Sequence, residues 1–240
     1  MSIQEDYSAL QQVMNDYSEW VRSSALKILP WVDIEKKSIV DFGCGRGDWL
    51  RVAKELAASR ILGLDTFALE KFQSDIPIEY VNLTEPVQLP DRWDIAMCLE
   101  VGEHLPENVA ATLVQSLVNA APVVLFSAAA PGQGGVHHIN EQPPEFWFDL
   151  FKMHGYQCFD FRDEIWADEE IEPWYRMGVL VFADPSHTPS QLKNYRREMA
   201  RHIIHPDIFA AYAPKGRNLI LHYDKKIKQW YPQFLEDSEK

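Results

Sequence analysis

The fold is decided by one stretch near the start of the chain, Ser38-Ile39-Val40-Asp41-Phe42-Gly43-Cys44-Gly45-Arg46-Gly47-Asp48-Trp49-Leu50. A short apolar run meets three glycines at alternate positions, and a helical pattern follows. This order predicts a strand, a tight turn and the start of a helix. Glycines suit such a turn because they adopt positive φ and, lacking Cβ, let a ligand approach the backbone. The helix would present free N–H groups to that ligand. A purely structural glycine-rich turn is the alternative.

An acidic residue supports the ligand-binding interpretation. Asp65 ends the next apolar run, Ile61-Leu62-Gly63-Leu64-Asp65, 22 residues after Gly43. At the end of the second strand of a Rossmann-like sheet, such a side chain accepts hydrogen bonds from ribose hydroxyls. The order of elements therefore predicts a nucleotide-type site. The turn reads Gly-x-Gly-x-Gly rather than Gly-x-Gly-x-x-Gly, which disfavours a dinucleotide oxidoreductase.

Four segments together resemble the motifs of class I S-adenosylmethionine (SAM)-dependent methyltransferases. They are residues 40–47, 63–65, 82–86 and 93–101, and the resemblance extends over residues 36–184. Many relatives carry Asp where this chain has Asn82, but Asn can also hydrogen-bond an adenine amine. The resemblance implies a SAM site in which the glycines shape the bend and Asp65 holds the ribose. The implied SAM-binding residues are Asp41, Phe42, Gly43, Cys44, Gly45, Gly47, Asp65, Asn82, Leu83, Leu99 and Glu100.

The composition indicates a folded, acidic protein. The 240 residues are 46% apolar, and the formal net charge is −13. This charge disfavours nucleic acids and anionic membranes as partners. Residues 187–240 are net basic, and packing on the acidic body is the simplest use of that charge. The polar N-terminus, the absence of a long apolar run and the unpaired spacing of three cysteines predict a cytoplasmic protein without a membrane anchor. A homodimer is one possible assembly.

Alternating strand and helix patterns predict an α/β fold. We expect a Rossmann-like, seven-stranded, mostly parallel sheet with helices on both faces. The resemblance implies that the final strand, within 176–183, runs antiparallel. A polar, basic helix is expected at 189–203. The predicted units are an N-terminal helical cap over 1–30, a SAM-binding methyltransferase domain over 31–185 and a basic helical or irregular C-terminal appendage over 186–240.

A group of potential metal ligands follows the predicted fourth strand. Glu100, Glu103 and His104 form Glu-x-x-Glu-His, and in a turn entering a helix these side chains would converge. Two carboxylates and an imidazole suit Mg²⁺ or another divalent cation. The segment also resembles the metal-binding motif of ubiquinone-biosynthesis O-methyltransferases and small-RNA 2′-O-methyltransferases; Asn108 stands where the former complete the set. In the alternative, Glu103 and His104 only support the start of the helix.

Two adjacent histidines lie in a glycine-rich loop after the predicted fifth strand. A histidine near neutral pKa can take a proton from a hydroxyl or ammonium acceptor. Adjacent side chains usually point apart, so we expect at most one of His137 and His138 in the chemistry. We favour His138, with His104 as its competitor, and His138 is also a candidate fourth metal ligand. The polar residues Asn140, Glu141 and Gln142 suit either a polyol or the start of the next helix.

The sequence predicts a SAM-dependent methyltransferase that acts on a hydroxyl of a small polar acceptor, such as a sugar, a polysaccharide precursor or a natural product. The expected catalytic residues are His104, His138, His137 and Glu103, with a histidine or a divalent metal handling the proton. Two alternatives stay open. One is an N-methyltransferase that acts on an amino sugar or amine without a metal. The other is a non-catalytic SAM-binding partner protein.

Overall fold

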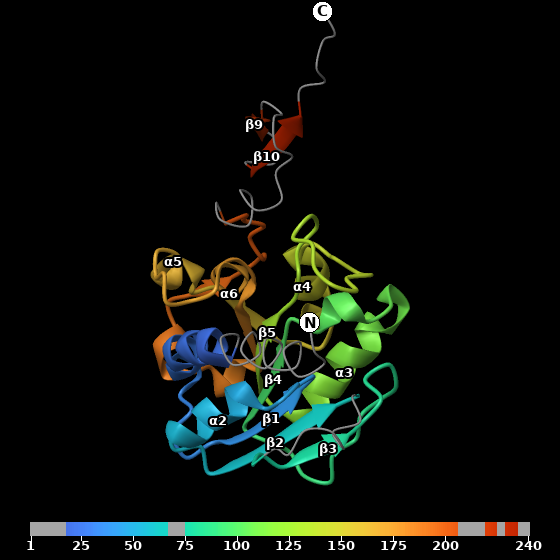
Figure 1. Cartoon of the computed structure of the whole chain (residues 1–240), viewed down its shortest axis with the longest axis vertical. Coiled ribbons are helices and arrows are strands. Elements are labelled where there is room, and N and C mark those ends of the chain that lie inside the picture. Colours follow the sequence, from blue (N-terminus) through green and yellow to red (C-terminus); the bar gives the residue numbers. More distant parts are fainter. Residues whose placement is uncertain (1–17, 67–74, 206–218, 225–228, 235–240) are drawn as a thin grey trace, which may run out of the picture.

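The computed structural model describes residues 18–66, 75–205, 219–224 and 229–234, the last two ranges by their backbone only. Its centre is one sheet of eight strands in the order β3-β2-β1-β4-β5-β7-β6-β8 (Figure 1). The strands are β1 (Ser38–Phe42), β2 (Arg60–Asp65), β3 (Ile78–Tyr80), β4 (Ile95–Leu99), β5 (Val123–Ser127), β6 (Gln157–Phe159), β7 (Leu180–Ala183) and β8 (Arg196–Arg197).

Helices cover both faces of this sheet, as the alternating pattern predicts (Figure 1). Neighbouring residues of β1 show the two layers, because Val40 belongs to one apolar cluster and Ile39 to the other. The Val40 cluster includes α3 and α4, and the Ile39 cluster includes residues 18–28 with α2 and α6. The helices are α2 (Asp48–Glu55), α3 (Ala110–Ala120), α4 (Pro144–Met153), α5 (Arg162–Ile165) and α6 (Pro173–Gly178), with 3₁₀ helices η1 (Leu29–Val32), η3 (Gly102–His104), η4 (Glu107–Val109), η5 (Pro185–His187) and η6 (Ser190–Leu192).

The strand directions confirm the Rossmann-like prediction and correct its strand count. Strands β3, β2, β1, β4 and β5 are parallel, whereas β7 is antiparallel to β5 and β6 is antiparallel to β7. The sheet has eight strands rather than seven, because β8 pairs with β6 through Cys158 opposite Arg197 and Phe159 opposite Arg196. The carboxyl ends of β4, β5 and β6 therefore meet at one edge of the sheet, where ligands of open α/β sheets bind.

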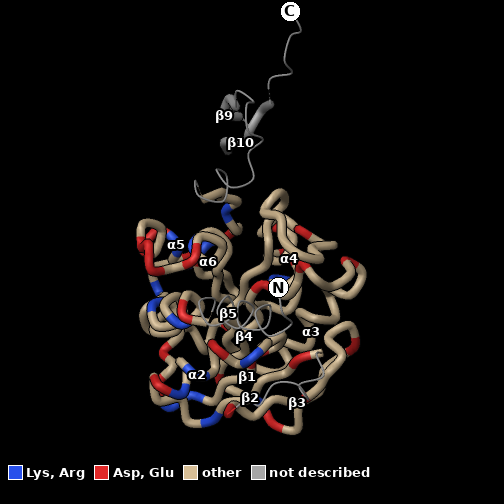
Figure 2. Tube along the Cα trace, in the orientation of Figure 1, with Lys and Arg blue, Asp and Glu red and all other residues tan. Residues whose placement is uncertain are grey.

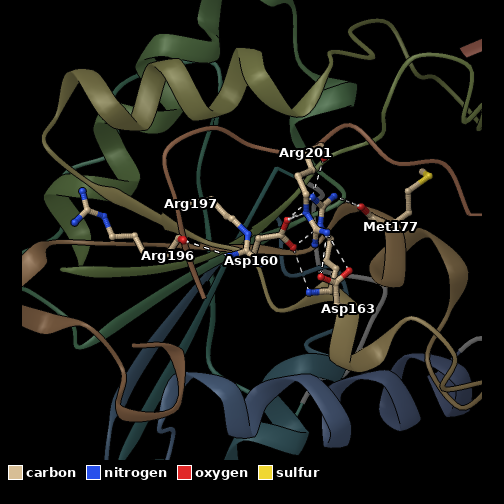
Figure 3. Close-up of polar contacts among 7 residues, drawn as sticks. Asp160, Asp163, Met177, Arg196, Arg197 and Arg201 are labelled. Carbon is tan, nitrogen blue, oxygen red and sulfur yellow. Dashed lines mark hydrogen bonds and ion pairs between the residues drawn. The ribbon is translucent and has the colours of Figure 1, made fainter. Parts of the chain in front are cut away.

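The predicted helix at 189–203 is wrong. This segment forms η6 and then β8, and Asp160 N donates to Tyr195 O at 2.9 Å beside the β6–β8 pair. Arg201 then binds the buried Asp160 carboxylate, with 2.6 Å between Nε and Oδ2 (Figure 3). These tertiary partners draw the segment onto the sheet edge, which a local helical pattern does not anticipate.

Several predictions concern the ends of the chain. The helix predicted within 4–29 is described only over 18–28, and most of its apolar stripe and the short helix expected near 67–73 lie outside the described residues. The appendage predicted as helical or irregular contains an antiparallel pair of strands, β9 (Leu219–Asp224) and β10 (Gln229–Phe234). The three domain boundaries stay a prediction. Within the described ranges, every helix is too short or too polar to cross a membrane.

Candidate active site

The glycine turn between β1 and α2 has the conformation that its sequence predicts. Gly43, Gly45 and Gly47 have φ of 80°, 53° and 81°, values that strain any residue with a Cβ. A Cβ on Gly43 would overlap Val101, and one on Gly47 would lie 3.1 Å from Ile76. A Cβ on Gly45 would meet no heavy atom of a non-adjacent residue within 4 Å. The turn is thus packed on two sides and open at its centre, which leaves room for a ligand against the backbone.

Two carboxylates flank this turn. Asp65, at the end of β2, accepts a hydrogen bond from Gly45 N at 2.8 Å. Asp41 is buried in β1, and burial together with the nearby Asp65 charge raises its pKa to about 7. The position of Asp65 beside the open glycine turn suits a carboxylate that accepts hydrogen bonds from the ribose of an adenosyl ligand. The residues present therefore fit SAM on geometry alone.

The other residues assigned to SAM contribute in different ways. Phe42 and Leu83 are buried in the core, so only their backbone can line a ligand, whereas Cys44 is partly exposed. Asn82 is exposed, and its Oδ1 accepts hydrogen bonds from Thr84 N and Thr84 Oγ1 at 3.1 and 2.7 Å. This turn orders the segment after β3 and engages the amide oxygen that the sequence assigns to adenine.

A buried acidic pair follows β4. Leu99 is 8% exposed, Glu100 has a positive φ of 54°, and Glu103 in η3 is fully buried. Burial and the charge of Glu100 raise the pKa of Glu103 to about 9; burial also raises the pKa of Glu100, although Gln133 Nε2 donates to it at 2.8 Å. Glu100 Oε1 and both carboxylate oxygens of Glu103 lack a hydrogen bond of normal geometry among the described residues. A cation bound between these two carboxyl groups would stabilise their ionised forms, because no positive charge within the pair does so.

Glu103, His104 and His138 form one group of potential ligands. One donor atom from each lies within 4.8 Å of the others, and the two imidazole rings pack edge to face with centroids 4.9 Å apart. His104 is exposed by surface area, but the neighbouring loop partly shields its ring from water. This partial burial and the nearby histidines lower its pKa, which favours the neutral form that metals bind. A carboxylate and two imidazoles are donors that suit Zn²⁺, Mn²⁺ and related cations. The side chains present thus fit a divalent cation.

Backbone hydrogen bonds join the two segments that carry this group. Ile139 N and Asn140 N both donate to Glu103 O, at 2.9 and 3.0 Å, and Asn140 Nδ2 donates to Gly102 O at 3.2 Å. His104 Nδ1 lies 3.3 Å from His137 O. The loop after β5 is therefore fastened to η3, and residues 35 positions apart in sequence are held together.

The remaining candidates lie apart from this group. His137 is exposed and contributes its carbonyl oxygen rather than its ring. Asn108 is exposed in η4 and lines a surface hollow of about 540 Å³ with Phe146 and Leu150. Of the two adjacent histidines, only His138 joins Glu103 and His104.

Two contacts in the site were not predicted from the sequence, which did not single out Gln133 and assigned Glu141 to a polyol or to the start of the next helix. Gln133 binds Glu100, and Glu141 binds His138, with 3.0 Å between Oε1 and Nδ1. The spacing of three residues between His138 and Glu141 is a weak local signal for their pair. No local signal connects Gln133 with Glu100, because they lie in loops after different strands.

Comparisons with known proteins agree with this geometry. A family model described as a methyltransferase domain matches residues 15–158. Ubiquinone biosynthesis O-methyltransferases are similar in sequence: that of Pseudomonas fluorescens (strain Pf0-1) is 26% identical and that of Pseudomonas putida (strain W619) 28%, each aligning with 69% of this chain and 78% of its own. A SAM-dependent methyltransferase structure from Archaeoglobus fulgidus has a TM-score of 0.51 at 15% identity, covering 69% of this chain and 94% of its own.

Proposed function

Since the chain belongs to the class I SAM-dependent methyltransferase family, we propose that it methylates a hydroxyl oxygen of a small polar acceptor, such as a sugar, a polysaccharide precursor or a natural product, with help from a divalent cation. One observation carries this proposal. Glu103 and His104 follow β4, the strand beside β1 and its glycine turn, and His138 joins them from the loop after β5. A metal-donor set next to a SAM site suits an acceptor that must lose a proton, as a hydroxyl does.

The SAM side of the reaction depends on residues at the ends of β1, β2 and β4. Bound SAM supplies a methyl group on a positively charged sulfur. Gly45 leaves the backbone open to it, Asp65 would accept from the ribose hydroxyls, and Leu99 with Glu100 would line the SAM site from the end of β4, which pairs with β1. Methyl transfer gains most from holding donor and acceptor in line, so these residues act chiefly by position.

The acceptor side depends on the ligand group. Glu103, His104 and His138 would hold the cation, with Glu100 as the fourth candidate ligand. A bound divalent cation would lower the pKa of an acceptor hydroxyl that touches it. Glu100 and Glu103 would then both be ionised, because the cation offsets the burial that raises both pKa values and the repulsion by Glu100 that adds to it at Glu103. Without a cation, neutral His104 or His138 is the base for the same proton.

The charge distribution supports a cation on this side. Residues 95–151 contain six acidic residues and no Lys or Arg. Figure 2 shows the consequence, since the part of the molecule around α3 and α4 carries red positions and almost no blue. Such a field raises the local concentration of cations and disfavours polyanionic acceptors. The similarity to ubiquinone biosynthesis O-methyltransferases supports oxygen as the acceptor atom.

The proposal is tested first by calorimetric titration with S-adenosylhomocysteine, Mg²⁺ and Mn²⁺. We expect S-adenosylhomocysteine to bind, and Mn²⁺ affinity to fall at least about tenfold in His138→Asn. His137→Asn is the matched control, because it changes the neighbouring imidazole and Asn tolerates the positive φ of 60° at that position.

Transfer of labelled methyl from SAM to a panel of phenols, sugars and amines then identifies the acceptor atom. Transfer to a hydroxyl that EDTA suppresses supports the proposal. Transfer to amines that EDTA leaves unchanged would establish the N-methyltransferase instead. A protein that binds S-adenosylhomocysteine but methylates nothing in the panel would favour the non-catalytic binding protein and count against the proposal.

A further inference from the structure

The loop that carries His138 contains an acidic residue for which the proposed function has no use. Glu141 Oε1 lies 3.0 Å from His138 Nδ1 and accepts a hydrogen bond from Gly134 N at 2.7 Å. The other oxygen, Oε2, accepts from Gly132 N at 2.8 Å. One side chain therefore joins two positions of the glycine-rich bend to the imidazole. Both partners are mostly buried, with side chains 12% exposed for His138 and 21% for Glu141.

These contacts determine which nitrogen of His138 carries its proton. A carboxylate only accepts hydrogen bonds, so the ring must donate through Nδ1. In the neutral imidazole the lone pair is then on Nε2, the nitrogen that is left for a ligand or a proton. We propose that Glu141 is a positioning residue that holds His138 in the Nδ1–H tautomer and so presents Nε2 to the site formed with Glu103 and His104. The use of Nε2 for catalysis rests on the proposed function, whereas the tautomer does not.

A glycine on the opposite side of the ring completes the arrangement. A Cβ on Gly135 would overlap Nε2 and Cε1 of His138 and lie 2.7 Å from Cδ2. Real Cβ atoms do not approach so closely, so any other residue at position 135 must displace the imidazole. Glu141 thus holds the ring at Nδ1, while Gly135 leaves the space that Nε2 requires. The two residues constrain the same ring independently, which provides two separate ways to disturb it.

The alternative role for Glu141 is to cap the following helix, but its hydrogen bonds do not support that role. Helix α4 begins after Pro143, and no side chain makes a capping hydrogen bond there. The described hydrogen bonds of Glu141 all go to the glycine bend and to His138. Asn140, the other polar residue that the sequence offered as a cap, is 4% exposed and binds Gly102 O. The hydrogen bonds of Glu141 therefore stabilise the loop and orient the imidazole, and they do not cap the helix.

The direct test is the tautomer of His138 in the metal-free protein. Long-range ¹H–¹⁵N NMR spectra of ¹⁵N-histidine-labelled protein, recorded well above the ordinary pKa of histidine, distinguish protonated from unprotonated ring nitrogens. The His138 signals are assigned by their loss in His138→Asn. We expect Nδ1–H in the wild-type protein and a mixture or Nε2–H in Glu141→Gln, whose amide offers only one acceptor oxygen. Wild-type His138 in the Nε2–H form, or a tautomer unchanged in Glu141→Gln, would overturn the proposal.

Metal affinity provides the second readout. Mn²⁺ titration should show an affinity about 10- to 100-fold lower in Glu141→Gln, as is typical for partners of metal-binding histidines. Gly135→Ala, which leaves Glu141 intact, should show a similar loss together with shifted His138 signals. Glu107→Gln removes an exposed carboxylate of η4 and should change neither measurement. Unchanged Mn²⁺ affinity in Glu141→Gln, alongside a metal-binding wild-type protein, would contradict the positioning role.

The two readouts separate this inference from the proposed function. If the wild-type protein shows the Nδ1–H tautomer and Glu141→Gln abolishes it, the positioning by Glu141 holds even when no Mn²⁺ binds. In that case the cation in the proposed function fails, and His138 Nε2 remains as a positioned base. S-adenosylhomocysteine affinity should be the same in all these variants, because none of the residues borders the glycine turn.

Discussion

Two buried carboxylate clusters lie at the same edge of the sheet and are built in opposite ways. The acidic pair, Glu100 and Glu103, follows β4, and the described residues place no Lys or Arg in an ion pair with either one. The Asp160 cluster follows β6 and consists of Asp160 with Arg162 and Arg201. Figure 3 shows Asp160 beside Arg201. Burial raises the pKa in the first cluster, whereas in the second the guanidinium groups outweigh burial and lower the pKa of Asp160 well below its usual range.

The two clusters differ in whether a buried carboxylate has a basic partner within the part of the protein that the structure describes. Arg162 is fully buried, bonds both oxygens of Asp160 at 2.8 and 2.9 Å, and also donates to Arg201 O at 2.7 Å. The Asp160 cluster is thus largely satisfied within the protein and fastens the segment after β8 to the sheet. The acidic pair has no Lys or Arg partner among the described residues, so burial and the charge of Glu100 raise the pKa of Glu103 instead.

The largest expected effect is on the Asp160 cluster. Asp160→Asn keeps the shape of the side chain but leaves Arg162 buried without its counter-charge. We expect the free energy of unfolding to fall by about 3–5 kcal/mol, as for other broken buried ion pairs. Denaturant titration measures the change. Asp163→Asn is the control, because Asp163 also binds Arg201 but is 60% exposed, and its loss should cost no more than about 1 kcal/mol. Equal effects of the two variants would show that the Asp160 cluster is not a structural anchor.

The second prediction concerns Asp41, a further buried carboxylate, which has an acidic rather than a basic neighbour. Its pKa is about 7 in the folded protein, above the 3.8 of an ordinary Asp, so the folded state binds the extra proton between these values. The stability of the ligand-free protein should therefore fall as pH rises through this window, by up to about 1.4 kcal/mol per pH unit from this group. Asp41→Asn should remove that slope. Parallel pH profiles for the two proteins, measured by denaturant titration, would refute the prediction.

The smallest expected effect on stability is at the acidic pair. Glu103→Gln should change the free energy of unfolding by no more than about 1 kcal/mol at neutral pH in EDTA, because a carboxyl with a pKa of about 9 is already neutral there. The same variant should lose at least about tenfold in Mn²⁺ affinity, measured by calorimetry. If Glu103→Gln destabilised the protein as much as Asp160→Asn, the two clusters would not differ in their contribution to stability.

Local pattern was sufficient for most of the fold. The positive φ values at Gly43, Gly45 and Gly47 follow from their spacing, and the buried strands follow from apolar runs. The antiparallel β7, which the family resemblance implies, is confirmed. Strand β8 could not be predicted in this way, because its residues are polar and its pairing depends on β6, on Asp160 and on Arg201, which lie far apart in sequence.

The site was predictable to a similar extent. Glu103 and His104 are adjacent in sequence, so their proximity required only a turn. The divergence of neighbouring side chains predicted that at most one of His137 and His138 would join them, and His138 was the one favoured. Gln133 was missed, and Glu141 was given another role, because the path of a glycine-rich loop depends on hydrogen bonds to distant residues, such as those from residues 139 and 140 to Glu103 O. Asn108 was the opposite case. Its spacing of four residues from His104 suggested, by the family resemblance, a metal ligand, but the structure places it in a surface hollow.

The sequence by itself therefore determined the order of βα units, the glycine turn and the positions of acids at strand ends, because these depend on backbone preferences and on apolar periodicity within short windows. Only the tertiary structure decided which buried charges meet a partner. Asp160 lies between two arginines, which lower its pKa, whereas Glu103 lies beside Glu100, whose charge adds to burial and raises the pKa of Glu103. The physical reason is that electrostatic and hydrogen-bond energies depend on distances in space, and the loops that set those distances carry no periodic signal.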